Sequence, residues 1–205
     1  MPGTPQLGTI CGLFLTHWHG PPMTPTSPLI IPPQPWLLHG WVEHSRILLD
    51  SYRHWVGHEL LPRNRSAEEQ AEALFEAPFV VVSHGTQPDP ILNYGNRTAL
   101  QLWHITMDQL RQTPSRLTAE PLHRDERARL LDRTTRQGFV DDYQGIRIAT
   151  TGQRFLIRQA TVWNLQDAGG LPVGQAATFS HWELLQSART NGNPDLTPDS
   201  DRDCR

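Results

Sequence analysis

The chain has 205 residues, of which 37% are hydrophobic and 19% are charged, and its formal net charge is −3. This length predicts one domain with tails. Domains that bind polyanions such as nucleic acids are usually strongly basic, so the slightly negative net charge argues against this class of protein. All eighteen basic residues are arginine, which excludes chemistry that depends on a lysine Schiff base or a Walker lysine.

The two cysteines lie near the chain ends, at Cys11 and Cys204. Their number and placement exclude a disulfide framework, a cysteine zinc site and a cysteine nucleophile inside the folded region. The apolar run at residues 10–15 is too short for a membrane span, and no basic segment precedes it. We therefore expect a cytoplasmic protein.

The first 38 residues form a proline-rich segment that is expected to be disordered or PPII-like. Nine of the eighteen prolines lie within residues 1–35. Met23 is a second candidate start codon, and the sequence leaves open which methionine begins the protein. Residues 187–205 are rich in Asn, Asp and Pro and are expected to form a disordered tail.

An amphipathic helix is predicted over residues 39–61, because apolar and aromatic residues recur there at steps of three and four. A second helix is predicted over residues 66–76, where Ser66 and Glu69 form a capping box. Together these helices occupy residues 39–77, a segment that flanks the domain proper.

The domain proper, residues 78–186, alternates strand and helix signals. Asn96 is the expected N-cap of its first helix, and two Gly-containing connections join its last three strands. Strands are predicted at residues 79–82, 91–95, 139–148, 154–165 and 173–182, and helices at residues 97–103, 106–112 and 125–137. This order predicts an α+β fold, a five-stranded antiparallel sheet with helices on one face, preceded by the N-terminal amphipathic helix.

Four segments resemble the MEKHLA domain, a PAS-like module found alone in cyanobacteria and algae and at the C-terminus of plant class III homeodomain leucine-zipper regulators. They are residues 94–103 (YGNRTALQLW), 114–121 (PSRLTAEP), 145–149 (GIRIA) and 175–182 (QAATFSHW). The stretch from Pro78 to Trp103 is also similar to the opening of a PAS domain, where a strand pair leads to an Asn that starts a helix. The resemblance covers roughly residues 41–185. It implies a PAS-like fold and a sensor of a small molecule or stimulus, and it implies no catalytic residue.

Because PAS-like modules hold ligands between helices and sheet, the resemblance also limits the cofactor. A flavin–cysteine adduct and a hydroxycinnamate chromophore both need a cysteine, so both are excluded here. Haem needs an axial ligand, for which His123 is the candidate, although a surface histidine is the plainer interpretation. A non-covalent flavin or a small metabolite remains open.

The candidate pocket residues are chosen by residue type and by the face of the sheet to which alternating side chains of a strand point. Trp103 and Trp163 either stack on a ligand or belong to the core, and Gln159 and Gln175 either face solvent or supply a pocket amide. Two arginines in residues 154–164 favour a parity that turns Gln159 and Trp163 inward. The candidate ligand-binding residues are Asn96, Trp103, His123, Gln159, Trp163 and Gln175.

Other polar clusters are interpreted as structure or surface. His54 and His58 have a spacing that can hold a metal, but apart from the distant His44 no third ligand shares their helix face, so no metal site is expected. The helix over residues 125–137 carries a mixed-charge face that includes Arg127, which we interpret as solvated surface rather than a nucleic-acid patch.

The aromatic stripe of the helix over residues 39–61 has two interpretations. Either it packs across the sheet of its own domain, or Trp41, Leu48, Tyr52 and Trp55 pair with a second copy, and the two can coexist. The resemblance supports a homodimer, because PAS-like modules commonly dimerise through flanking helices.

The sequence therefore predicts a ligand-binding or protein-interaction module that signals through a partner protein. The alternatives are an enzyme that uses the same pocket, with flavin as one option, and a pure interaction module without a pocket. No phosphate-binding loop, HExxH or GxSxG motif supports the enzyme.

Overall fold

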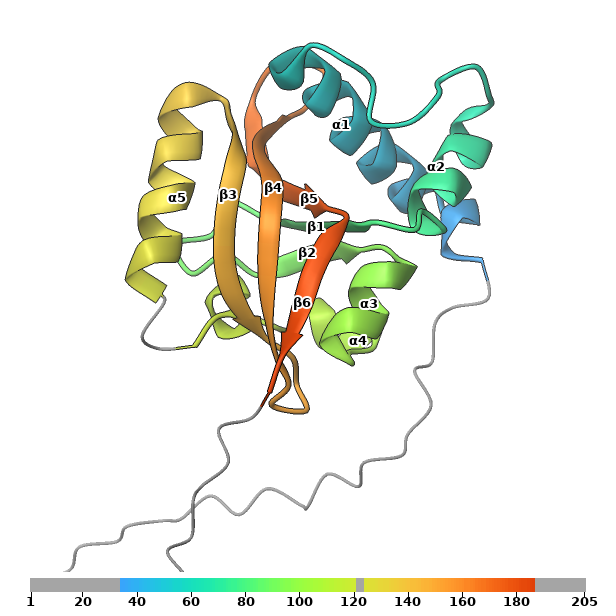
Figure 1. Cartoon of the computed structure of the whole chain (residues 1–205). Coiled ribbons are helices and arrows are strands. Elements are labelled where there is room, and N and C mark those ends of the chain that lie inside the picture. Colours follow the sequence, from blue (N-terminus) through green and yellow to red (C-terminus); the bar gives the residue numbers. More distant parts are fainter. Residues whose placement is uncertain (1–33, 121–123, 187–205) are drawn as a thin grey trace, which may run out of the picture.

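One antiparallel sheet organises the computed structural model, which describes residues 34–120 and 124–186 (Figure 1). Its strands are β1 Val80–His84, β2 Leu92–Gly95, β3 Phe139–Ile148, β4 Arg154–Gln166 and β5 Pro172–Phe179, in the order β2-β1-β5-β4-β3. A further strand, β6 His181–Leu185, pairs with the first half of β4, while β5 pairs with its second half. The expected five-stranded sheet is confirmed, with the last predicted strand divided into two at Ser180.

The helices largely follow the predicted pattern. They are α1 His39–Val56, α2 Ala67–Phe75, α3 Arg97–Trp103, α4 Met107–Leu110 and α5 Arg124–Gln137, with 3₁₀ turns at Pro35–Leu37 and Ser115–Thr118. Helix α1 ends before the predicted Leu61, because Gly57 adopts a left-handed conformation (φ 87°) and caps it. The predicted capping box of Ser66 and Glu69 opens α2. No helix in these described stretches is both long and apolar enough to cross a bilayer.

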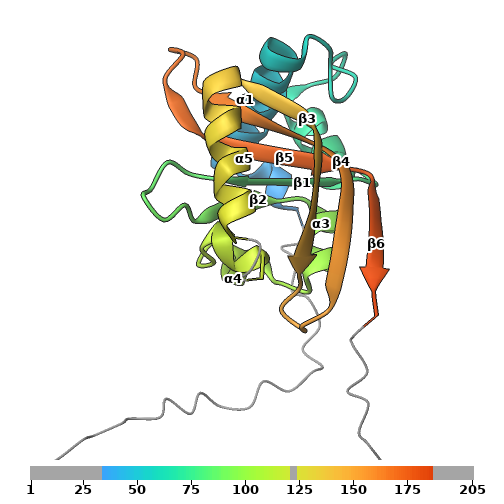
Figure 2. The same ribbon diagram turned by 60° about the vertical axis from the view of Figure 1, so that its left-hand side comes forward.

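The helices cover the two faces of the sheet separately. Figures 1 and 2 show α5 on one side and the pair α1–α2 on the other. On the α1 face, Tyr52 packs edge-on against Trp163 of β4, with ring centroids 5.1 Å apart. On the α5 face, Gln175 of β5 donates a hydrogen bond to the backbone carbonyl of Leu131 (3.0 Å). The part of the sheet between α1 and α5 is therefore a middle layer, whereas β6 is largely exposed.

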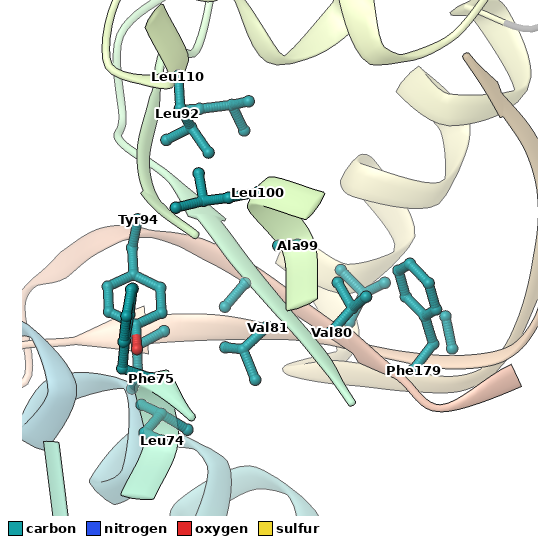
Figure 3. Close-up of a cluster of buried hydrophobic side chains, with 14 of the residues drawn as sticks. Leu74, Phe75, Val80, Val81, Leu92, Tyr94, Ala99, Leu100, Leu110 and Phe179 are labelled. Atoms are coloured by element: carbon teal, nitrogen blue, oxygen red, sulfur yellow. The ribbon is translucent and has the colours of Figure 1, made fainter. Parts of the chain in front are cut away.

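A core cluster joins elements that are far apart in the sequence (Figure 3). Phe75 of α2, Val81 of β1, Tyr94 of β2 and Leu100 of α3 are all essentially buried. At the centre of these elements Asn96 caps α3, as predicted: its Oδ1 accepts from the backbone N–H groups of Val81 and Ala99, both at 3.0 Å. This one side chain fixes the position of α3 relative to β1.

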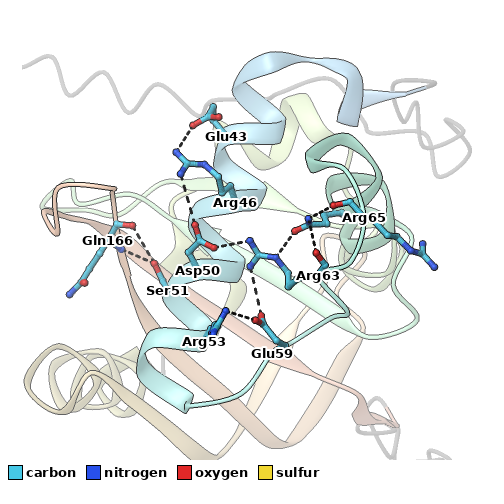
Figure 4. A network of polar contacts seen from close by, with 10 residues as sticks. Glu43, Arg46, Asp50, Ser51, Arg53, Glu59, Arg63, Arg65 and Gln166 are labelled. Carbon is cyan, nitrogen blue, oxygen red and sulfur yellow. Dashed lines mark hydrogen bonds and ion pairs between the residues drawn. The ribbon is translucent and has the colours of Figure 1, made fainter.

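The outer side of α1 carries a network of ion pairs (Figure 4). Arg46 contacts Glu43 (2.8 Å), Arg63 contacts Asp50 (2.7 Å) and Arg53 contacts Glu59 (3.1 Å). Most of these groups are exposed, and exposed ion pairs add little to the free energy of unfolding. The network is a solvated surface that holds the connection between α1 and α2 against the helix.

Candidate functional site

A cavity of about 60 Å³ lies between the sheet and helices α3 and α5. Its apolar lining includes Val82, Trp103, Leu130, Ala160, Val162 and Phe179. The fold therefore places a cavity where the resemblance implied a ligand pocket.

An irregularity in β4 decides which of its side chains face this cavity. Gln159 has a left-handed backbone (φ 51°) and is exposed. Ile157 and Ala160 both line the cavity although they are three residues apart, so a bulge changes the alternation between them. The predicted inward direction of Gln159 and Trp163 is thereby corrected: Gln159 points to solvent, and Trp163 is buried on the α1 face.

Two buried arginines line the cavity. Arg127 of α5 is 9% exposed and Arg147 of β3 is 6% exposed. Arg127 donates from Nη2 to Ser115 Oγ (2.8 Å), and Arg147 donates from Nη1 to the carbonyl of Ile146 (2.9 Å). Burial, together with the nearby charge of Arg147, lowers the pKa of Arg127 to about 10. Within residues 34–120 and 124–186, neither guanidinium forms an ion pair with a carboxylate.

Arg147 is supported by an aromatic ring on its own strand. Its guanidinium lies 5.1 Å from the centre of the Tyr143 ring. Gly145 lies between these residues, and a Cβ atom there would collide with the Tyr143 hydroxyl group. The absent side chain at position 145 therefore lets Tyr143 lie along β3 beneath Arg147.

His84 and Gln175 add polar groups from β1 and β5. His84 Nδ1 lies 2.9 Å from the carbonyl of Gly85, so Nδ1 carries a proton, and burial lowers the pKa of the ring. His84 Nε2 is buried and has no hydrogen-bond partner in the described part of the chain. Gln175 Nε2 is held by Leu131 O, Thr135 Oγ1 and Asn164 Oδ1 at 2.9–3.0 Å.

A second, more open groove of about 470 Å³ adjoins the cavity. It shares His84, Leu131 and Gln175 with the cavity lining, and Trp55 and Pro172 border it further out. The three shared side chains therefore form the wall between cavity and groove.

The predicted site residues are distributed unevenly. Trp103 and Gln175 line the cavity, whereas Asn96 is completely buried and its side chain is used by backbone groups. Gln159 and Trp163 lie outside the cavity, and His123 lies outside the described residues.

Sequence reasoning missed the two arginines. Arg127 lies three residues before Leu130 and seven before Thr134, the helix face that is buried, and Tyr143, Gly145 and Arg147 share one parity of β3. These spacings are the sequence signals that could have indicated that Arg127 and Arg147 lie on inward-facing positions.

The aromatic and apolar side chains of α1 pack mainly on the sheet of their own domain, which is the first of the two predicted interpretations. Trp41, Leu48 and Tyr52 are buried within the chain itself, which corrects the alternative that they face a second copy. Trp55 is half-buried and covers Gly138 at the end of α5.

The volume of the cavity tests whether a non-covalent flavin, one of the expected ligands, can bind there. An engineered cavity that binds benzene measures about 150 Å³, whereas this one measures about 60 Å³. A three-ring flavin does not fit the cavity in this structure.

Comparison with known proteins finds a matching family model. The model of the MEKHLA domain family matches residues 42–184. No curated protein sequence matches the chain.

Similar solved structures include a PAS domain from Colwellia psychrerythraea, with a TM-score of 0.47, 14% identity and coverage of 54% of this chain and 92% of that one. Another is the PAS domain of a LuxR-family transcriptional regulator from Burkholderia thailandensis in complex with ethanol, with a TM-score of 0.42, 18% identity and coverage of 56% and 95%. A third is the light-state dimer of the fungal blue-light photoreceptor Vivid, with a TM-score of 0.44, 11% identity and coverage of 63% and 91%.

Proposed function

The chain belongs to the MEKHLA domain family, and from this premise we propose that it is a sensory module that binds a small molecule between its sheet and α5. The observation that carries the proposal is the cavity between sheet and helices, whose walls are mainly apolar and whose few polar side chains converge on one space. Ligand sites in proteins typically have this composition.

Strand β4 offers a route from the cavity to the outside of the domain. Val162 lines the cavity, and its neighbour Trp163 packs on Tyr52 of α1. A ligand that displaces β4 would therefore change how α1 packs, provided that it binds the two arrangements with different affinity. We propose that a partner protein, or a second copy of the chain, reads this change in the cytoplasm.

Filling the cavity tests the proposal. The full chain is titrated with propan-1-ol, propionamide and sodium propionate, and binding is followed by the melting temperature and by backbone amide NMR shifts. The variant Ala160→Val adds two methyl groups to the cavity wall, and Ala168→Val adds the same groups to an exposed turn.

We expect at least one of these probes to bind the natural chain and the Ala168 variant, and to bind the Ala160 variant at least tenfold more weakly. The proposal fails if none of the three probes binds, or if the Ala160 variant binds them as well as the natural chain does.

A further inference from the structure

We propose that the cavity is built for an anion, a small carboxylate held between Arg127 and Arg147. This inference rests on the proposed function and names the class of ligand. It starts from the two guanidinium groups, which line one cavity and are both more than nine-tenths buried.

The charges around the cavity are unbalanced. Arg127 and Arg147 repel each other, and the carboxylate that acts on Arg127, Asp89, is already bound to Arg116 at 3.0 Å. A buried charge without a counter-charge is costly, and a bound anion would remove both this cost and the repulsion.

The hydrogen-bond donors are unbalanced in the same way. Each guanidinium carries five N–H donors. Among the described residues, Arg127 donates one hydrogen bond, to Ser115 Oγ, and Arg147 donates one, to the carbonyl of Ile146. Trp103 Nε1 is also buried without a partner among the described residues. A carboxylate, which only accepts hydrogen bonds, complements the spare donors of the two guanidinium groups.

The rest of the lining sets the shape of the ligand. Away from the arginines the walls are apolar, with Leu130, Val162 and Phe179 among them, and the volume is about 60 Å³. These features favour a carboxylate with a short alkyl chain. Because the cavity is not fully enclosed, the chain need not lie wholly within this volume, and propionate is the probe of this class. Free phosphate is disfavoured, because it would leave oxygens against apolar walls.

Sodium propionate and propionamide provide the decisive comparison, since the two have the same shape and differ in charge. Apparent affinities are obtained from the melting temperature of the full chain at constant ionic strength. The variants are Arg127→Met and Arg147→Met, and the control is Arg129→Met, which removes an exposed arginine from the same helix.

We expect propionate to bind at least tenfold more tightly than propionamide to the natural chain and to the Arg129 variant. We also expect this preference to disappear in the other two variants. If those variants do not fold, the arginine Nε–H signals of the natural chain decide: propionate, and not propionamide, should shift two of them.

Other outcomes separate this inference from the proposed function. If propionamide or propan-1-ol binds as tightly as propionate, the anion inference fails and the sensory proposal stands. If none of the three probes binds, both fail.

Discussion

His44 of α1 and Ser83 of β1 are joined by a hydrogen bond of 2.9 Å that ties the helix to this strand of the sheet. Ser83 donates its own hydroxyl proton to Asn93 Oδ1 (2.6 Å), so His44 Nε2 acts as the donor to Ser83. Burial, and secondarily the charge of Arg111, lowers the pKa of His44 from 6.5 to about 4. The folded protein therefore keeps this ring neutral.

Acid should weaken the fold through His44. Between pH 6.5 and about pH 4 the unfolded chain binds a proton at this residue and the folded chain does not. The contribution to stability is complete above pH 6.5 and is lost as the pH falls towards 4, at a cost of roughly 2–3 kcal/mol. In urea unfolding, the free energy of unfolding should fall less between pH 7 and pH 5 for His44→Gln than for the natural chain. The exposed His58→Gln control should behave like the natural chain, and equal losses in all three proteins would contradict the assignment.

Asn96→Ala should destabilise the protein by about 2–4 kcal/mol. The substitution removes the cap of α3, leaves the N–H of Val81 without its partner and frees the carbonyl of Phe79, which Asn96 Nδ2 contacts at 2.7 Å. Chemical denaturation measures the loss. Asn64→Ala, at an exposed position, is the matched control and should change the free energy of unfolding by less than about 0.5 kcal/mol. Similar values for the two variants would mean that Asn96 does not hold these elements together.

Gly138→Ala should be more harmful than Gly152→Ala. Both glycines have left-handed backbones, at φ 90° and φ 82°, so alanine costs about 1–2 kcal/mol at either position. At Gly138 the new methyl group would also collide with the Trp55 indole, whereas the space at Gly152 is open. We expect an additional loss of about 2 kcal/mol at position 138, measured by thermal or urea unfolding. An equal effect of the two substitutions would show that the Trp55 side chain moves aside at no cost in stability.

The elements of the fold were predictable because their signals are local. The capping residues Ser66 and Asn96 mark helix starts directly, and glycine-containing turns mark the hairpins. The face that each side chain takes in β4 was not predictable in this way. A single bulge residue, Gln159, changes the alternation, and the bulge depends on how β3 and β4 pair.

The candidate site was harder to predict than the fold, because its main residues contradict the usual burial pattern. Arginine is rarely buried without a partner, so a helix rich in charges indicates a solvated surface, and Arg127 was interpreted in that way. The stripe on α1 presented a different difficulty. Packing Trp41 and Tyr52 on the chain's own sheet or on a second copy buries the same kind of surface, and only the three-dimensional arrangement distinguishes the two.

The wall between cavity and groove has a consequence for kinetics. Gln175 anchors β5 to α5 through Leu131 and Thr135, and it stands between the cavity and the open groove. If the proposed ligand binds behind this wall, it would leave by this side only when those hydrogen bonds break and α5 moves away from β5. Its residence time by this route would then follow the frequency of this local opening rather than the strength of its own contacts. Such a module would respond slowly to a falling ligand concentration and so would retain a record of earlier exposure.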